Sequence, residues 1–368
     1  AEQGGGVRAH QRLTLLTAGD LPGPSGGTVY HDRVAAASPA VDVRPLPGAW
    51  PSPGGVGHDA LRQCLGVGTG PVLIDGIVAC GAPEAVTEAV RRGRPVWVLL
   101  HLPLPAETGL GDPERRRLAG SERAALHAAT GVICTSAWAR EDLLARYGPL
   151  TVHVAEPGAD DAPLARGSEP LRLLTIASLT PRKNHLTLLE ALGRLGQRDW
   201  QAHWVGPEAP SRQHRSRLRA ALAASPVAHR IRVTGPLHGE LLRREWHAAD
   251  LLVLPSLAET YGMVVTEALA RGIPALVGAG TGAEATLRGA GGAGHRLPGD
   301  ADGPGHGLPG DAVDPTDPTA VADALDRWLG DPVLRSHRRR LAMDSRADLQ
   351  PWSRTTALIL DIVAPVDR

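Results

Sequence analysis

The stretch that decides the fold is PSLAETYGMVVTEALARGIPALV, residues 255–277. The apolar run over 250–256 that leads into it predicts a buried strand. A loop follows, then a helix over 264–272 that stops at a glycine, and then a second apolar run over 273–278. Continuous apolar strands separated by amphipathic helices are typical of a parallel sheet covered on both faces.

The same alternation extends along the chain in both directions. Further strands are predicted over 12–18, 71–79, 94–105, 131–136, 150–158, 171–178, 201–206 and 230–235. Further helices are predicted over 26–37, 83–93, 121–129, 137–148, 185–195, 211–224, 240–249, 317–329 and 354–365. A stretch rich in Pro, Gly and acidic residues (156–170) predicts an interdomain linker, and a Gly- and Pro-rich stretch (289–311) predicts a flexible loop.

The predicted fold class is therefore α/β, with two doubly wound, Rossmann-like domains facing a central cleft. We expect domains at 1–160 and 168–345, and a C-terminal segment, 346–368, whose helix packs back towards the N-terminal domain. In such folds ligands bind at the carboxyl ends of the strands. Polar residues at strand ends are therefore the first candidates for a site.

Composition excludes several classes of protein. The formal net charge is zero, which argues against a nucleic-acid-binding protein. Three cysteines (Cys64, Cys80 and Cys134) without CxxC spacing argue against a zinc site or a disulfide framework and fit a cytoplasmic location. No apolar run approaches 18 residues, so no transmembrane helix is expected. The first twelve residues lack the apolar core of a signal peptide, and the oligomeric state is left open.

Two carboxylates flank the start of the decisive helix, Glu259 in the loop and Glu267 within the helix. Thr260 is the predicted N-cap, and the backbone N–H groups of residues 261–264 would form an anion site at the helix N-terminus. Gly262 would let a ligand approach the backbone. The alternative is that Glu259 is a loop charge and Glu267 a surface charge, although an apolar helix start favours a half-buried position for Glu267.

Lys183 is the only lysine in 368 residues that contain 39 Lys plus Arg, and Asn184 beside it is the only asparagine. A bias towards Arg over the whole chain makes a retained lysine informative, because lysine offers a compact charge on a flexible stem and arginine a rigid fork. Chance placement in a loop before a helix is the alternative. From the residues alone, the two explanations have about equal weight.

These residues resemble the retaining glycosyltransferases of the GT-B fold. The spacing of Glu259 and Glu267 matches the E-x7-E motif of these enzymes, and the stretch 255–277 looks like glycosyltransferase family 4. SGGTVYHDRV (25–34) is similar to the glycine-rich loop of the family, and IASLTPRKN (176–184) to the first strand and loop of its nucleotide-binding domain. DGIVA, LLHLPL and VAEPGAD are similar to segments of actinobacterial-type members, so the resemblance covers nearly the whole chain.

The resemblance implies a metal-independent hexosyltransferase that moves a sugar from a GDP- or UDP-linked donor to an acceptor hydroxyl with retention of configuration. It needs no cofactor. Its implied catalytic residues are Glu259, His101 and Lys183. The implied donor-binding residues are Gly26, Gly27, Ser178, Arg182, Lys183, Thr260, Tyr261, Gly262, Met263, Val264 and Glu267.

The resemblance gives expected contacts for several of these residues. Lys183 would contact the diphosphate, Glu259 the donor sugar, and Glu267 the ribose. Gly26 and Gly27 would close over the phosphates. His101, at the end of a predicted strand, would face the sugar or the acceptor, although a histidine in that position is by itself more often a plain loop residue.

The sequence departs from the family pattern in two places. Many relatives have a phosphate-binding arginine where this chain has Ala177 and Ser178, and Arg182 is the candidate substitute. GAGTGAEATL (278–287) replaces the usual Gly-Gly and Pro-Glu, with Glu284 as the equivalent acid. The same stretch formally fits the dinucleotide fingerprint G-x-G-x-x-A, whose acidic residue would be Asp300 or Asp302, but a lone fingerprint is a weak signal.

Three other functions stay open at this point. A phosphorylase or a nucleotide-sugar epimerase has the same architecture, and a non-catalytic relic that binds a nucleotide-sugar would keep the same motifs. The base, sugar and acceptor are not identified. The lack of a basic amphipathic helix weakly disfavours a membrane-lipid acceptor.

Overall fold

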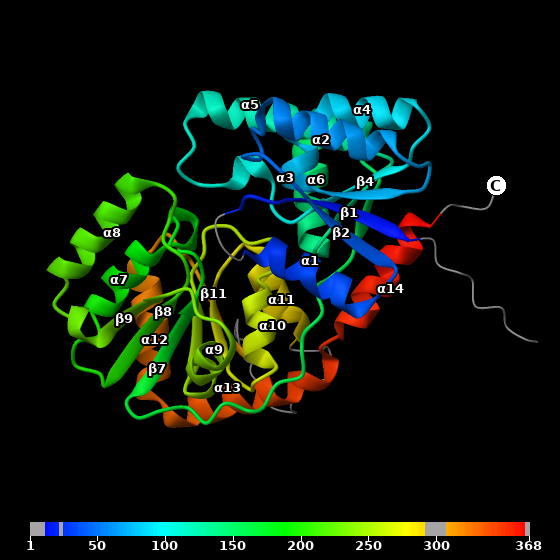
Figure 1. The fold of residues 1–368 in the computed structure, drawn as a ribbon. Helices are drawn as coiled ribbons and strands as arrows, with labels where there is room; N and C mark the ends of the chain where they lie inside the picture. The colour runs from blue at the N-terminus through cyan, green and yellow to red at the C-terminus, as the bar shows by residue number, and fades with distance from the viewer. Residues whose placement is uncertain (1–11, 22–24, 291–306, 365–368) are drawn as a thin grey trace, which may run out of the picture. The chain divides into compact units, whose positions relative to one another are not determined.

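The computed structural model describes residues 12–21, 25–290 and 307–364. They form two compact units (Figure 1). Unit 1 takes in Ala1–Pro105, Leu110–Gly158 and Trp352–Arg368, and unit 2 takes in Ala106–Gly109 and Ala159–Pro351. Residues 155–168, which contain the predicted boundary, have no regular secondary structure. The C-terminal helix is grouped with unit 1.

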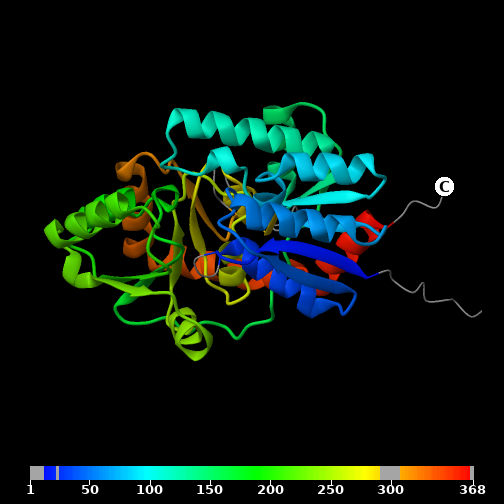
Figure 2. The ribbon, with the colours of Figure 1, turned by 45° about the horizontal axis from the view of Figure 1, so that its top comes forward.

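Unit 1 is built on a parallel sheet with the strand order β2-β1-β3-β4-β5-β6. Its strands are β1 (Leu13–Ala18), β2 (Val41–Leu46), β3 (Val72–Asp75), β4 (Val96–Leu100), β5 (Gly131–Cys134) and β6 (Val152–Val154). Its helices are α1 (Gly26–Ala37), α2 (Gly54–Gly66), α3 (Gly76–Ala79), α4 (Pro83–Arg91), α5 (Asp112–Ala128), α6 (Ala137–Tyr147) and α14 (Trp352–Val363), and the 3₁₀ turn η1 (Leu104–Ala106) follows β4. Helices α2, α4 and α5 lie on one face of this sheet, and α1 and α14 on the other (Figures 1 and 2).

Unit 2 is a second parallel sheet, with the order β12-β11-β10-β7-β8-β9. Its strands are β7 (Leu171–Ile176), β8 (Trp200–Val205), β9 (Ile231–Gly235), β10 (Leu251–Leu254), β11 (Ala275–Gly278) and β12 (Gly310–Val313). Its helices are α7 (His185–Gly193), α8 (Arg212–Ala224), α9 (Gly239–His247), α10 (Met263–Leu269), α11 (Gly282–Ala290), α12 (Pro318–Gly330) and α13 (Pro332–Asp344), with 3₁₀ turns η2 (Pro181–Lys183), η3 (Ala228–Arg230) and η4 (Ser345–Asp348). The predicted α/β class with two doubly wound sheets is confirmed.

Several details differ from the sequence prediction. The strand expected over 71–79 ends at Asp75, because that side chain accepts a hydrogen bond from the Ile77 N–H at 3.2 Å and starts the helical turn α3. The predicted flexible loop is shorter than 289–311. Residues 289–290 end α11, residues 310–311 begin β12, and 291–306 lie outside the described residues. The elements β2, α2, α11, β12 and α13 were not predicted.

The only asparagine of the chain ties three strands of unit 2 together. Asn184 is buried and has φ of 64°, a left-handed conformation that asparagine tolerates better than most residues. Its Nδ2 donates to the carbonyl oxygens of Pro255, after β10, and Pro315, after β12, at 3.1 and 2.5 Å. Its Oδ1 accepts from the Thr187 hydroxyl in α7. Asn184 therefore fixes the loop that contains Lys183 against the neighbouring strand ends.

Two substitutions of Asn184 are expected to separate the contribution of its side-chain hydrogen bonds from that of its positive φ. Asn184→Ala loses both donors and keeps the unfavourable φ, so the free energy of unfolding should fall by about 2–4 kcal/mol. Asn184→Gly loses the same donors but accepts the positive φ, and it should be about 1 kcal/mol less destabilised than the alanine variant. Urea unfolding followed by circular dichroism measures both. An alanine variant within about 0.5 kcal/mol of the native protein would contradict this role.

Candidate functional site

The strand order of unit 2 reverses between β7 and β10, which lie side by side. From β7 the chain continues outward through β8 and β9, and from β10 it continues the other way through β11 and β12. Such a reversal of strand order marks the usual ligand site of a doubly wound sheet, at the carboxyl ends of its strands. Lys183 lies on the loop after β7, and Glu259 on the loop after β10.

Three charged side chains from these two loops meet at this point, and a fourth, Glu107, accepts from Nε of Arg182 at 3.3 Å. The Lys183 ammonium donates a short hydrogen bond to Oε1 of Glu259, and Nη1 of Arg182 lies 3.7 Å from Oε2 of the same carboxylate. Arg182 Nη1 also donates to the Ala258 carbonyl at 2.8 Å, and the Leu257 N–H donates to the Arg182 carbonyl at 2.8 Å. The two loops are thus joined by backbone as well as by charge.

Burial makes this cluster costly unless its charges stay paired. The side chains of Lys183, Arg182 and Glu259 are 15%, 13% and 10% exposed. Burial lowers the pKa of Lys183, and the attraction of Glu259 opposes this without reversing it. Burial would raise the pKa of Glu259, but the neighbouring Lys183 and Arg182 outweigh it and hold that pKa below its usual value. The pairing therefore favours the charged form of each group against the effect of burial.

The start of α10 differs from the prediction. The N-cap is Gly262, with φ of 83°, and not Thr260. Only a glycine fits well here, because the backbone is left-handed and an added Cβ would lie 2.9 Å from Cβ of Ala283 in α11. The helix has seven residues, so its dipole is small, and Tyr261, Met263, Val264 and Glu267 are half-buried along it.

The remaining predicted residues of unit 2 lie around the same loops. Ser178 is half-buried after β7, and its carbonyl accepts from the Thr180 N–H at 2.8 Å. Arg182, the candidate substitute for the missing arginine, lies within the charged cluster. Glu284 caps the turn before α11 by accepting from the Gly280 N–H at 2.7 Å. Asp300 and Asp302, the acids of the rival dinucleotide pattern, lie outside the described residues.

In unit 1, the predicted residues Gly26, Gly27 and His101 lie at the carboxyl edge of the sheet. Gly26 and Gly27 open α1 after a capping box formed by Ser25 and Thr28. His101 directly follows β4. A Cβ added to Gly27 would lie 3.0 Å from the His101 ring, whereas one added to Gly26 would meet nothing within 4 Å. Gly27 therefore leaves room for the imidazole, and Gly26 faces open space.

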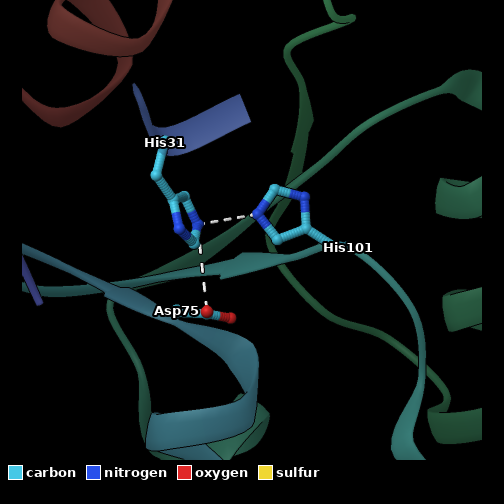
Figure 3. Close-up of side chains that lie close together, drawn as sticks. All are labelled: His31, Asp75 and His101. Carbon is cyan, nitrogen blue, oxygen red and sulfur yellow. Dashed lines mark hydrogen bonds and ion pairs between the residues drawn. The ribbon is translucent and has the colours of Figure 1, made fainter. Parts of the chain in front are cut away.

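Two residues that we did not predict complete this group (Figure 3). Nε2 of His31, in α1, lies 2.8 Å from Nε2 of His101 and 3.9 Å from a carboxylate oxygen of Asp75, at the end of β3. The sequence did contain a signal for His31, since it follows Gly27 by four residues and so lies on the same face of the helix. The sequence predicted a strand over 71–79 that includes Asp75, so its position at the end of β3, beside the histidines, was not expected.

Burial keeps this second group close to neutral. It lowers the pKa of His31 to about 4 and the pKa of His101 well below its usual value. It raises the pKa of Asp75 to about 7, and the hydrogen bond from Ile77 opposes this in part.

No helix among the residues that the structure describes is long and apolar enough to cross a membrane.

Sequence comparisons relate the C-terminal half to glycosyltransferases. Residues 170–331 match the family model "Glycosyl transferases group 1". A D-inositol 3-phosphate glycosyltransferase from Geodermatophilus obscurus is 32% identical over 206 residues, 50% of this chain and 46% of the relative. One from Salinispora tropica is 29% identical over 286 residues, 70% of this chain and 55% of the relative. The chain thus spans about half the length of these curated relatives.

Comparison with solved structures shows the fold over nearly the whole chain. Sucrose-phosphate synthase from Thermosynechococcus elongatus superposes with a TM-score of 0.73 at 18% identity, covering 96% of this chain and 98% of the other. HepE from Anabaena, solved in complex with UDP-glucose, gives 0.73 at 15% identity, covering 95% and 99%. The chain therefore has the GT-B fold, as the resemblance implied, while assignment to family 4 within that fold stays a prediction.

Removing the anion of the unit 2 cluster should destabilise the protein strongly. Glu259→Gln leaves the buried Lys183 ammonium without its carboxylate partner, while Arg182 keeps Glu107, and it is expected to lower the free energy of unfolding by about 3 kcal/mol. In a Lys183→Met background the same substitution should cost clearly less, since the main partner is already gone. Asp326→Asn removes the exposed partner of Arg198 and should cost less than about 1 kcal/mol. Equal losses from Glu259→Gln in both backgrounds would contradict the pairing.

Proposed function

From a C-terminal unit that matches the glycosyl transferases group 1 model and a whole chain with the GT-B fold, we propose that this protein is a retaining glycosyltransferase. Its donor is a nucleotide-diphospho-sugar, and its acceptor supplies a hydroxyl. The observation that carries the proposal is the buried Lys183–Glu259 pair, with Arg182, at the strand-order reversal of unit 2. Cations gathered in this way can also turn towards a second anion.

The donor diphosphate supplies that second anion. Lys183 is paired with Glu259, and Arg182 with Glu259 and Glu107, so a phosphate oxygen that enters beside them would compete with these carboxylates for two cations in a poorly hydrated place. The flexible lysine stem lets the ammonium turn from the carboxylate towards a phosphate. Arg182, anchored to the Ala258 carbonyl, keeps its position.

Charge moves onto this diphosphate during the transfer. The bond from the anomeric carbon to the distal phosphate oxygen breaks, and its electron pair stays on the phosphate. The acceptor oxygen bonds to the same face of the anomeric carbon, and its proton passes to the departing phosphate oxygen. Lys183 and Arg182 stabilise the growing negative charge because they are already in place before the reaction. We therefore expect no need for an added metal ion.

The other predicted residues take supporting roles in this proposal. Once Lys183 turns to the phosphate, Glu259 can accept hydrogen bonds from the donor sugar, and Glu267 from the ribose. Because α10 is short, backbone N–H groups over 260–264 contribute local hydrogen bonds rather than a helix field. In unit 1, Gly26 and Gly27 would close over phosphates, and His101 would face the sugar or acceptor. Ser178 adds a hydroxyl beside the β7 loop.

The relatives suggest which ligands to try. HepE was solved with UDP and with UDP-glucose, so uracil-based donors come first, followed by guanine-based ones. The curated relatives are named for D-inositol 3-phosphate, so a phosphorylated polyol belongs in the acceptor panel. At these identities neither ligand is assigned to this chain.

Thermal unfolding against a ligand panel tests the donor site. The panel contains UDP, GDP, ADP, UDP-glucose, GDP-mannose, NAD and NADP. A true ligand at a hundred times its dissociation constant should add about 2.7 kcal/mol of stability to the native protein. Lys183→Ala and Glu267→Ala should lose this gain. Lys183→Arg keeps the charge but not the shape and should weaken binding about tenfold, or 1.4 kcal/mol.

Arg243→Ala is the matched control, because it removes an exposed cation of unit 2 that pairs with Glu240 within α9. It should keep the full response. Stabilisation by NAD or NADP alone would favour the dinucleotide alternative. Donor binding with turnover only in the presence of phosphate, or without any acceptor, would indicate a phosphorylase or an epimerase. No response to any member of the panel would overturn the proposal.

A further inference from the structure

The unit 1 group formed by His31, Asp75 and His101 brings three metal-ligating side chains together from three separate elements. They come from the middle of α1, the end of β3 and the end of β4. β3 and β4 are neighbours in the sheet, with Asp75 paired to Leu99, so their carboxyl ends lie at one edge. Figure 3 shows the two imidazoles and the carboxylate turned towards one another.

Their separations place the three ligating groups within reach of one cation. Each residue offers one ligating atom, and the three atoms lie within 4.8 Å of one another. The two Nε2 atoms share a hydrogen bond at 2.8 Å, and His31 Nε2 is 3.9 Å from the carboxylate oxygen. Four-coordinate zinc bound at about 2.0–2.2 Å needs ligand atoms about 3.3–3.6 Å apart, so the two imidazoles would have to separate by about half an ångström and the carboxylate would have to move towards them.

The charge of Asp75 gives an independent reason to expect a cation. The carboxylate is 6% exposed, and within the described chain no Lys or Arg lies within 4.0 Å of it. A buried carboxylate without a counter-charge is costly, so it must take up a proton or face a cation. Two imidazoles face it and can offer lone pairs, so a divalent cation would satisfy all three groups at once.

Surrounding contacts hold the three ligands in place. The second carboxylate oxygen of Asp75 accepts from the Ile77 N–H, which fixes its orientation. The Tyr30 ring packs edge-on against His101 at 5.1 Å, and the missing side chain of Gly27 makes room for that imidazole. Such supporting contacts orient ligands in metal sites and reduce the cost of arranging them.

We propose that His31, Asp75 and His101 form a binding site for a single divalent transition-metal ion of the zinc class. Two imidazoles and one carboxylate are the ligand set of open zinc sites, in which water or another oxygen takes the fourth position. His101 is half-buried, while His31 and Asp75 are buried. The proposal concerns unit 1 alone and does not rest on the transferase activity.

Cobalt(II) serves as the probe, because a four-coordinate cobalt ion absorbs strongly in the visible range and a six-coordinate one only faintly. The full chain is stripped with a chelator, dialysed and titrated with cobalt chloride, and zinc is then added to displace the cobalt. We expect one cobalt per chain with the strong spectrum, displaced by one zinc. His31→Gln, His101→Gln and Asp75→Asn should each weaken binding about 100-fold or abolish it.

Two controls separate this result from nonspecific binding and from misfolding. His153→Gln removes another unit 1 histidine, which packs against Trp97, and should bind as the native protein does. Asp75→Asn keeps an oxygen for the Ile77 N–H, and circular dichroism checks that it is folded. A faint spectrum only, no saturable binding, or a folded Asp75→Asn variant that binds like the native protein would overturn the site. No donor or acceptor is present, so failure here leaves the transferase proposal untouched.

Discussion

The buried ion pair between Lys183 and Glu259 is the interaction on which the arrangement of the candidate donor site depends. Both charges are removed from water, so neither is tolerable without the other. The pair forms only because β7 and β10 are neighbours whose loops leave the same edge of the sheet. Asn184 fixes one of these loops through its hydrogen bonds to carbonyl oxygens that follow β10 and β12. The strand order, the hydrogen bonds of Asn184 and the ion pairs thus act together, and they position two cations before an anion enters.

Unit 1 uses the same geometry with a different chemistry. Its reactive side chains also follow neighbouring strands, but they are two imidazoles and a carboxylate rather than a lysine, an arginine and a carboxylate. In unit 2, paired charges compensate one another. In unit 1, burial disfavours the charged form of all three groups, and two imidazoles with one carboxylate are the ligand types of the proposed cation site. The two sheets therefore gather different chemistry at their carboxyl edges.

Much of this could be predicted from sequence, since buried parallel strands are continuous apolar runs and the helices between them are amphipathic. Lys183 stood out by being the only lysine, and Glu259 by its place after a buried strand. The sequence predictions were wrong where a local contact overrides the apolar pattern. Asp75 interrupts an apolar run by capping a helical turn, and the backbone of Gly262 turns left-handed where Thr260 was expected to cap α10. The partnership of His31 with His101 joins residues 70 positions apart, and no local pattern encodes it.

Because the chain has a single lysine, a protein labelled with ¹³C at lysine Cε gives one signal that reports on Lys183 alone. A pH titration of that signal, repeated with UDP and with GDP, tests the central claim most directly. Burial predicts a pKa below the usual lysine value in the free protein. A diphosphate beside the ammonium should shift the signal and raise that pKa. A signal that titrates like an exposed lysine, and that does not respond to a nucleotide that binds the protein, would contradict the account.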